Sequence, residues 1–329
     1  MRRIALAGFG FMGRMHYGNW KRIKGAKVVA ICDSNLAQLG QVAGGNIAGT
    51  ATDTDFTGIA VYDDFSKMVA AGGFDVVDIT LPTPAHPATA IAALEAGYDV
   101  LCEKPMALTL KECDRMLAAA DKAKRTLLVA HCLRFWPEYV ALKKLVDSGR
   151  YGKVTAASFR RCSPAPDPNG PRAWFLDEKK SGGCLLDMHI HDVDMIRFLF
   201  GEPHGVHVVS HRRDDGLLDH VQVEYAYPGK VVTGIVSWAV AKTHGFEAAF
   251  RVILERATIV FDTKRTVPFM VFPAKGRPFV PNLGKRNAYE AEQRYFLDLL
   301  RGRADASVLS ARDARATIAL IARIAAKCR

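Results

Sequence analysis

The sequence predicts an α/β protein of two domains, in which a doubly wound parallel sheet is followed by an α/β domain with a largely antiparallel sheet. Up to about residue 131, short β-rich runs alternate with helical stretches, which indicates a parallel sheet covered on both faces. Beyond about residue 200, strand-like runs follow one another, and Pro228-Gly229 marks a hairpin turn between two of them. A chain of 329 residues is long enough for two cores. We place the predicted domains at 1–131 and 132–329.

Hydrophobic periodicity gives the expected elements of each domain. The strands of the first domain are expected at Ile4–Ala7, Val28–Cys32, Val61–Tyr62, Val76–Leu81, Val100–Cys102 and Leu127–His131, with helices at about 11–23, 64–71, 86–96 and 109–124. In the second domain, helices at about 136–148 and 183–200 flank a proline-rich loop at 163–171. Its strands are expected at Val206–Arg213, His220–Tyr227, Val231–Trp238, Phe246–Leu254 and Thr258–Asp262, and helices at about 287–301 and 311–327 close the chain.

Composition excludes several classes of protein. Hydrophobic residues make up 49% of the chain and charged residues 24%, and no apolar run approaches the roughly 18 residues that cross a bilayer. The net charge of +11 comes from lysines and arginines spread along the chain, which favours an anionic cofactor or substrate over nucleic acid. The seven cysteines are scattered and never spaced Cys-x-x-Cys. We therefore expect a cytoplasmic protein without disulfides, a zinc site or a membrane span.

A glycine motif follows the first expected strand and opens the first expected helix. It reads Gly8-x-Gly10-x-x-Gly13, with Phe11 and Met12 before the last glycine. Gly8 permits a tight turn, Gly10 lets backbone amides approach a pyrophosphate, and Gly13 lets the helix pack close to the strand. Glycine-rich turns also occur without any nucleotide, but this placement predicts dinucleotide binding in a Rossmann-type domain.

Asp33 ends the second expected strand, 20 residues after Gly13. A carboxylate at this position accepts hydrogen bonds from the adenosine ribose and repels a 2′-phosphate, so NAD is predicted over NADP. His16 lies one turn into the first helix, where it either faces the cofactor or has a packing or capping role. We favour a packing or capping role.

Glu103-Lys104-Pro105 directly follows the fifth expected strand, at the edge where doubly wound sheets bind ligands. The Lys104 ammonium could hydrogen-bond a substrate hydroxyl or a developing alkoxide. Pro105 restricts Lys104 to extended conformations and is compatible with a cis peptide bond. The alternative is a solvated loop lysine.

The helix expected at 183–200 carries a second group of polar residues. With regular helical spacing, Asp187 and His191 lie four residues apart on one face, so His191 could act as general acid or base while Asp187 orients it or binds a substrate hydroxyl. His189-x-His191 also suggests a metal site, but side chains two residues apart on a helix diverge, and we predict no metal. A buried polar helix face is the remaining alternative.

Taken in order, these motifs resemble the glucose–fructose oxidoreductase, inositol dehydrogenase and rhizopine catabolism (Gfo/Idh/MocA) family of NAD(P)-dependent sugar and polyol oxidoreductases. The resemblance covers essentially the whole chain. It rests on Gly8, Gly10 and Gly13, on Thr83-Pro84-Ala85-His86, on Glu103-Lys104-Pro105, on Arg134-Phe135-Trp136-Pro137, and on Gly182-Gly183 with Asp187 and His191. His189 and His131 depart from the family pattern, and their roles stay open.

The resemblance implies roles for particular residues. Lys104 is the catalytic lysine, His191 the proton acceptor or donor, and Asp187 its substrate-binding partner. Pro82, Thr83 and His86 are implied near the nicotinamide and the phosphates, and we place Glu103 with these cofactor-binding residues. The second domain is implied to have a largely antiparallel open sheet, whose free face forms a homodimer or homotetramer.

The predicted function is therefore hydride transfer between a nicotinamide cofactor and a secondary hydroxyl, or its ketone, of a sugar, an inositol-like polyol or a sugar derivative. Two alternatives remain at this point. One is NAD-assisted glycoside cleavage without net oxidation, and the other is a non-catalytic NAD-sensing protein. The sequence indicates neither the sugar nor the direction of the reaction.

Overall fold

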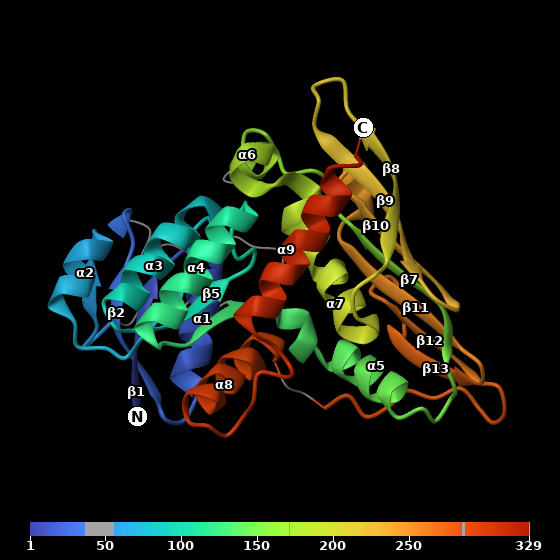
Figure 1. The fold of residues 1–329 in the computed structure, drawn as a ribbon, viewed down its shortest axis with the longest axis horizontal. Coiled ribbons are helices and arrows are strands. Elements are labelled where there is room, and N and C mark those ends of the chain that lie inside the picture. The colour runs from blue at the N-terminus through green and yellow to red at the C-terminus, as the bar shows by residue number, and fades with distance from the viewer. Residues whose placement is uncertain (37–55, 171, 285–286, 329) are drawn as a thin grey trace. The chain divides into compact units, whose positions relative to one another are not determined.

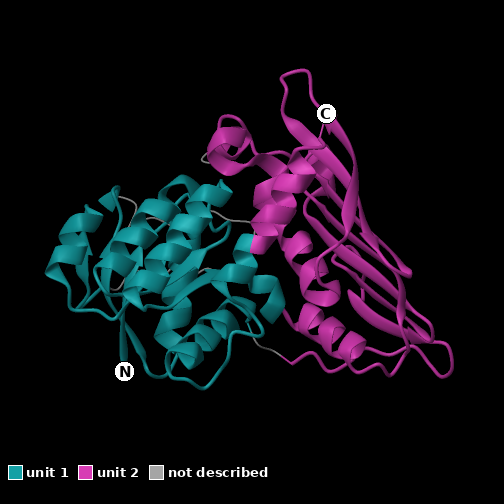
Figure 2. Cartoon of the chain, in the orientation of Figure 1, with its two compact units in different colours: residues 1–135, 286–315 teal, residues 136–285, 316–329 magenta. Residues whose placement is uncertain are grey.

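The computed structural model describes residues 1–36, 56–170, 172–284 and 287–328. They form two compact units, residues 1–135 with 286–315 and residues 136–285 with 316–329 (Figure 2). Of the predicted proline-rich loop, Pro171 lies outside the described residues. Each unit is described by itself.

Within the described residues, the first unit holds a six-stranded sheet in the order β3-β2-β1-β4-β5-β6. All its neighbouring strands are parallel, which confirms the predicted doubly wound sheet. Its strands are β1 (Arg2–Ala7), β2 (Ala26–Cys32), β3 (Ala60–Tyr62), β4 (Val76–Ile79), β5 (Asp99–Glu103) and β6 (Leu127–Ala130). The strand order reverses between β1 and β4, and sheets of this kind bind ligands outside the strand ends at that point.

The helices of this unit cover the sheet. They are α1 (Phe11–Arg22), α2 (Phe65–Ala71), α3 (His86–Glu95), α4 (Leu110–Ala123) and α8 (Ala288–Leu300), with short helical turns η2 (Thr83–Ala85) and η3 (Cys132–Phe135). Figure 1 shows α3 beside α4 and α8 beside α1. The start of α4 follows from local sequence, because the Thr109 hydroxyl accepts a hydrogen bond from the Glu112 amide and the Glu112 carboxylate accepts one from the Thr109 amide.

The first unit includes a segment from near the end of the chain, which differs from the predicted domains. Phe296 and Leu297 of α8, and Leu309 beyond it, are buried in the same apolar cluster as Ile4 and Trp20. The sequence prediction places residues 286–315 in the second domain, together with 132–135. An amphipathic pattern shows that one helix face is buried but not which element covers it.

Arg134 ties η3 to this returning segment. Its guanidinium donates to the carbonyl oxygen of Val308 at 2.6 Å and forms an ion pair with Asp313. The neighbouring Phe135 ring packs against Tyr295 of α8, with ring centroids 5.2 Å apart. Arg134 and Phe135, two residues of the family motif, therefore have a structural role inside the first unit.

The second unit is built on a seven-stranded sheet in the order β13-β12-β11-β7-β10-β9-β8, counted over the described residues. Its strands are β7 (Val154–Cys162), β8 (Gly205–Arg212), β9 (Leu218–Tyr227), β10 (Lys230–Ser237), β11 (Glu247–Leu254), β12 (Ala257–Asp262) and β13 (Phe269–Pro273). β7 and β10 are parallel, and the other pairs are antiparallel. The largely antiparallel sheet and its Pro228-Gly229 hairpin are confirmed, whereas the sequence prediction omitted β7 and β13.

The helical elements of the second unit lie mainly on one face of this sheet (Figure 1). They are α5 (Pro137–Asp147), η4 (Ala173–Leu176), α6 (Glu178–Ser181), η5 (Cys184–Met188), α7 (Ile190–Phe200), η6 (Lys242–His244) and the greater part of α9 (Ala311–Ala325). Tyr139 of α5 packs edge-on against Phe250 and Phe261 of the sheet, with centroids 5.1 and 5.7 Å away. No described helix has both the length and the apolar character needed to span a membrane.

The helix predicted at 183–200 is interrupted. Residues Cys184–Met188 form a π-helical turn, closed by the His189 amide on the Cys184 carbonyl at 3.0 Å, and α7 begins only at Ile190. Asp187 and His191 thus belong to different elements, and the regular four-residue spacing assumed from the sequence does not describe them.

Candidate active site

The loop between β1 and α1 is shaped by its glycines. Gly8 has a φ of +95°, and a Cβ added there would lie 2.9 Å from the backbone nitrogen of Leu81. A Cβ on Gly13 would overlap the carbonyl oxygen of Gly8. The fold itself therefore requires glycine at both positions, as a tight turn and as a close approach of α1 to the loop.

Gly10 has a different environment. Its φ of −71° is open to any residue, and a Cβ added there would meet no atom within 4 Å among the described residues. It stands at the start of α1, where the first-turn amides of Phe11, Met12 and Gly13 point out of the helix without intrahelical partners. Open space in front of a helix N-terminus fits the pyrophosphate of a dinucleotide.

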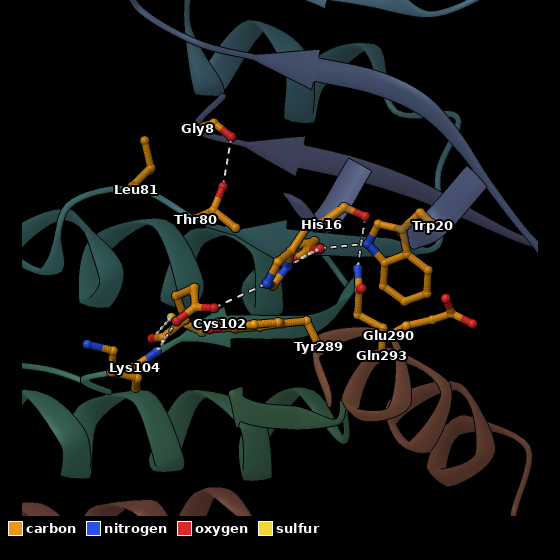
Figure 3. Close-up of polar contacts among 12 residues, drawn as sticks. Gly8, His16, Trp20, Thr80, Leu81, Cys102, Lys104, Tyr289, Glu290 and Gln293 are labelled. Carbon is orange, nitrogen blue, oxygen red and sulfur yellow. Dashed lines mark hydrogen bonds and ion pairs between the residues drawn. The ribbon is translucent and has the colours of Figure 1, made fainter. Parts of the chain in front are cut away.

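Two side chains hold this loop in place. The Thr80 hydroxyl, just beyond β4, donates to the Gly8 carbonyl at 2.8 Å (Figure 3). The Asp33 carboxylate, at the end of β2, accepts from the amide of Phe9 at 2.7 Å and from that of Asn35 at 2.8 Å. Asp33 is half-buried, and the backbone fixes it at the position predicted to contact the ribose.

Lys104 follows β5 at the same edge of the sheet as Gly8. Its side chain is half-buried, its amide donates to the Glu103 carboxylate at 3.0 Å, and its peptide bond to Pro105 is cis. On the other side of this turn, His86 Nδ1 lies 2.8 Å from the Pro105 carbonyl oxygen and His86 Nε2 lies 2.8 Å from that of Leu81. His86 is buried with both nitrogens at backbone carbonyls, and burial lowers its pKa.

The residues implied near the nicotinamide have different environments. Pro82 caps the short turn η2, Thr83 begins it, and the Thr83 side chain is buried. His86 shapes the loops on either side of it through its two carbonyl contacts. Pro82, Thr83 and Lys104 thus follow β4 and β5 at the carboxyl ends of the strands.

A buried polar network runs behind Lys104 (Figure 3). Asp78 lies in the middle of β4 with no exposed surface, and it accepts from Trp20 Nε1 at 2.6 Å and from His16 Nδ1 at 2.9 Å. His16 Nε2 lies 3.1 Å from the Glu103 carboxylate, and Gln293 of α8 donates to the His16 carbonyl at 3.1 Å.

The charged groups of this network shift one another's pKa values toward the ionised forms. Burial alone would lower the pKa of His16, but the carboxylates of Asp78 and Glu103 outweigh it and raise the pKa well above 6.5. Burial would raise the pKa of Glu103, and His16 and Lys104 reverse this, so that it lies below 4.5. His16 is thus the packed residue that the sequence favoured, and its raised pKa favours the protonated form.

In the second unit, Asp187 and His191 differ from the residues around them. From Gly183 to Ile196, every residue is buried except these two, which are half-exposed. Polar side chains with access to solvent on an otherwise buried segment are candidates for ligand contacts. The structure thus places Asp187 and His191 in this unit, whereas Lys104 and the glycine loop lie in the first.

The start of α7 is fixed by buried polar contacts. Asp192 receives two hydrogen bonds of 2.9 Å from the Arg161 guanidinium of β7. Burial would raise the pKa of Asp192, but Arg161 outweighs burial and lowers it. His189 is buried, with Nε2 2.9 Å from the Tyr225 hydroxyl. It fills the space above Gly234, where an added Cβ would lie 2.8 Å from the His189 ring.

Two further observations concern possible ligand sites. An open hollow of about 770 Å³ lies within the second unit, between the proline-rich loop, α6 and the β8–β9 hairpin, and its lining includes none of the predicted site residues. Among the described residues, no group of three or more His, Cys, Asp or Glu side chains is arranged to hold a metal ion.

Sequence reasoning missed the supporting residues Thr80, Asp78 and Gln293, and the partners of His16. One signal was available, since Asp78 interrupts the apolar run Val76-Val77-Asp78-Ile79. A carboxylate inside a buried strand must have a compensating partner. The sequence does not indicate that this partner lies on α1, 62 residues earlier.

A glycine loop at the switch point of a parallel sheet, with a fixed acid at the end of β2, defines a dinucleotide-binding domain of the Rossmann class. Comparison with known families agrees. Residues 2–131 match the oxidoreductase family described as having an NAD-binding Rossmann fold, and residues 139–260 match the GFO/IDH/MocA C-terminal domain. The chain belongs to this Gfo/Idh/MocA oxidoreductase family.

Curated relatives include D-apiose dehydrogenase of Paraburkholderia graminis, 32% identical over 200 residues that make up 60% of this chain and 49% of that protein. Inositol 2-dehydrogenase of Rhizobium meliloti is 31% identical over 200 residues, 61% of this chain and 55% of that protein. Myo-inositol 2-dehydrogenase of Thermotoga maritima is 32% identical over 202 residues, again 61% and 55%. The matches span about half the length of these relatives.

Solved structures share the fold over nearly the whole chain. Aldose-aldose oxidoreductase from Caulobacter crescentus, complexed with glycerol, has a TM-score of 0.84 at 22% identity, covering 99% of this chain and 97% of that one. A levoglucosan dehydrogenase complexed with NADH and levoglucosan has a TM-score of 0.83 at 22% identity, covering 99% and 96%. At this identity the likeness establishes the fold.

The environment of Gly10 gives a first prediction. In Gly10→Ala the new methyl group meets no atom of the described residues within 4 Å, so the free energy of unfolding should change by less than about 1 kcal/mol. The methyl group enters the space for the pyrophosphate, so NADH should bind at least about tenfold more weakly in a fluorescence titration. Gly205→Ala, whose Cβ would make an ordinary 3.9 Å contact, should change neither quantity. Unchanged NADH affinity in Gly10→Ala would contradict the assigned cofactor position.

The raised pKa of His16 gives a second prediction. Below about pH 6.5 the imidazole is protonated in both the folded and the unfolded chain. As the pH rises, the unfolded chain loses this proton and the folded chain keeps it. The contribution of His16 to the free energy of unfolding should then fall by about 1.4 kcal/mol per pH unit, until the pKa of the folded state is reached.

This loss is measured by denaturant unfolding between about pH 7 and pH 8. It should be present in the unmodified protein, absent in His16→Gln, and retained in His204→Gln, which changes an exposed histidine. Equal slopes in the unmodified protein and in His16→Gln would show that His16 is not held as a cation.

Proposed function

We propose that the protein is a dehydrogenase that transfers hydride between NAD and a secondary hydroxyl carbon, or its ketone, of a sugar or an inositol-like polyol. The observation that carries the proposal is the half-exposed pair Asp187 and His191 on an otherwise buried segment. Support comes from the open space at Gly10 in the NAD-binding domain and from the relatives, which are named as apiose and inositol dehydrogenases.

In this proposal the residues of the chain act on the hydroxyl group and its proton. His191 accepts the hydroxyl proton during oxidation and returns it during reduction. Asp187 orients His191 or binds a neighbouring substrate hydroxyl. The Lys104 ammonium hydrogen-bonds the same substrate oxygen and stabilises the negative charge that develops there. When bound, the nicotinamide supplies the hydride acceptor or donor.

NAD is proposed over NADP because of Asp33. Two backbone amides fix its carboxylate at the end of β2, so it cannot easily turn away from the adenosine ribose. A fixed carboxylate accepts hydrogen bonds from ribose hydroxyls and repels a 2′-phosphate.

We also propose that the protein is a homodimer or homotetramer that associates through the free face of the second sheet. Val209 on β8 and Val231 on β10 are 60% and 59% exposed. Val231 and Ile253 flank Ala156 in the strand register, so they lie on the same face. Exposed aliphatic side chains across several strands are typical of a contact surface. Light scattering should give two or four times the mass of one chain, and a monomer would contradict this proposal.

The function is tested with a panel of polyols and sugars that includes myo-inositol, apiose and levoglucosan, each with NAD and with NADP. At least one compound should yield reduced cofactor and a stoichiometric ketone or lactone, faster with NAD. Release of a free sugar from a glycoside without net reduction would replace the proposal with redox-assisted glycoside cleavage. NADH binding without turnover on the whole panel would favour a sensing role.

The residue roles are tested by Lys104→Ala and His191→Ala. Each should lower kcat by about 10²- to 10⁴-fold, because each removes a group that acts on the reacting oxygen, while NADH affinity stays within about threefold. The exposed residues Lys67 and His204 provide the matched controls Lys67→Ala and His204→Ala, which should retain full turnover. Near-normal turnover in both site variants would refute these roles.

A further inference from the structure

The polar network of the first unit connects the centre of the sheet to Lys104. Asp78 of β4 bonds His16 of α1, His16 lies 3.1 Å from one oxygen of Glu103, and the other oxygen of Glu103 accepts from the Lys104 amide at 3.0 Å (Figure 3). Asp78 and His16 have no exposed surface, and Glu103 has almost none. These contacts are confined to the first unit.

The geometry of His16 determines which hydrogens it carries. Each ring nitrogen faces a carboxylate oxygen, on Asp78 at 2.9 Å and on Glu103 at 3.1 Å. A neutral imidazole has only one N–H, so its other nitrogen would direct a lone pair at a carboxylate. With both carboxyl groups ionised, both contacts are favourable only for the imidazolium. The raised pKa of His16 is in keeping with this.

If its role were only structural, this group of buried charges would have a high desolvation cost. Two buried carboxylates and one buried imidazolium lose their hydration, and apolar side chains of similar shape often stabilise a core as well or better. Such a network does give precise geometry, because each hydrogen bond fixes a direction. Here the fixed direction is that of the Glu103 carboxylate, which in turn holds the amide of Lys104.

We propose that His16 is a positioning residue for Lys104, acting through Glu103 to set the direction in which the lysine leaves β5. His86 holds the far side of the same turn through the Pro105 carbonyl. The backbone at Lys104 is therefore held on one side by His86 and on the other by Glu103, which His16 contacts. The inference rests on the role proposed above for Lys104, and it adds a residue that does not itself contact substrate.

Two variants distinguish the effect of the hydrogen-bond chain from the effect of side-chain size. In His16→Gln, the side-chain amide donates to one carboxylate but presents its oxygen to the other, so the chain is broken. In the double variant His16→Gln with Asp78→Asn, the introduced asparagine donates from its amide to the oxygen of the introduced glutamine, and the glutamine amide donates to Glu103. The asparagine oxygen still accepts from Trp20. The chain of hydrogen bonds is then restored with uncharged groups.

The first measurement is the rate at which trinitrobenzenesulfonate labels Lys104, followed by peptide mass spectrometry, with Lys67 as internal reference. His16→Gln should change the Lys104 rate severalfold, and the double variant should return it toward that of the unmodified protein. NADH affinity should stay within about threefold in both. An unchanged Lys104 rate in His16→Gln would overturn the inference, whatever the enzyme's substrate.

The second measurement is turnover of the best compound from the panel. His16→Gln should lower kcat by about 100-fold, the order expected from a shift of about 1 Å in a reacting group, with KM little changed. The double variant should recover most of this loss, and His204→Gln should show none. A loss that the double variant does not recover in folded protein would refute positioning by the hydrogen-bond chain. If labelling responds but Lys104→Ala keeps full turnover, the proposed role of Lys104 fails and the positioning stands.

Discussion

A carboxylate at the centre of a parallel sheet must be matched by positive charge, and Asp78 imposes this constraint on the first unit. Its oxygens contact His16 and Trp20 of α1, and His16 extends the contact to Glu103 at the end of β5. One group of buried charges therefore fixes α1 to β4 and β5. Because the glycine loop leads directly into α1, the parts of the unit proposed for cofactor and for substrate share the same support.

The second unit follows the same physical rule with different residues. Asp192 of α7 is buried and held by Arg161 of β7 through two hydrogen bonds of 2.9 Å. In each unit a buried carboxylate with a buried basic partner is the sequence neighbour of a proposed functional residue. Glu103, paired with His16, directly precedes Lys104. Asp192, paired with Arg161, directly follows His191. Anchoring the neighbouring residue fixes the backbone from which a half-exposed side chain extends, and such preorganisation lowers the cost of orienting a reacting group.

The sequence predicts those features of the fold that depend on local pattern. The glycine loop, the six parallel strands and the Pro228-Gly229 hairpin all follow from short-range rules of backbone conformation and hydrophobic period. β7 was missed because alanines and two arginines conceal its alternation, although Ala157, Phe159 and Arg161 are buried. The sequence alone does not show that Arg161 is buried, because its burial depends on the partner Asp192. The π-helical turn before α7 was also missed, because the prediction assumed regular helical spacing.

The return of α8 to the first unit has a consequence for how the protein is made. The apolar cluster of this unit contains Phe296, Leu297 and Leu309, so its core is incomplete until Leu309 has left the ribosome. The N-terminal region cannot finish folding before the second unit has been synthesised, unlike contiguous domains, which fold one after another. A gene fragment that ends at residue 131 therefore encodes the six-stranded sheet without α8, which packs on it. A fusion of residues 1–135 to 286–315 contains all the residues of the first unit.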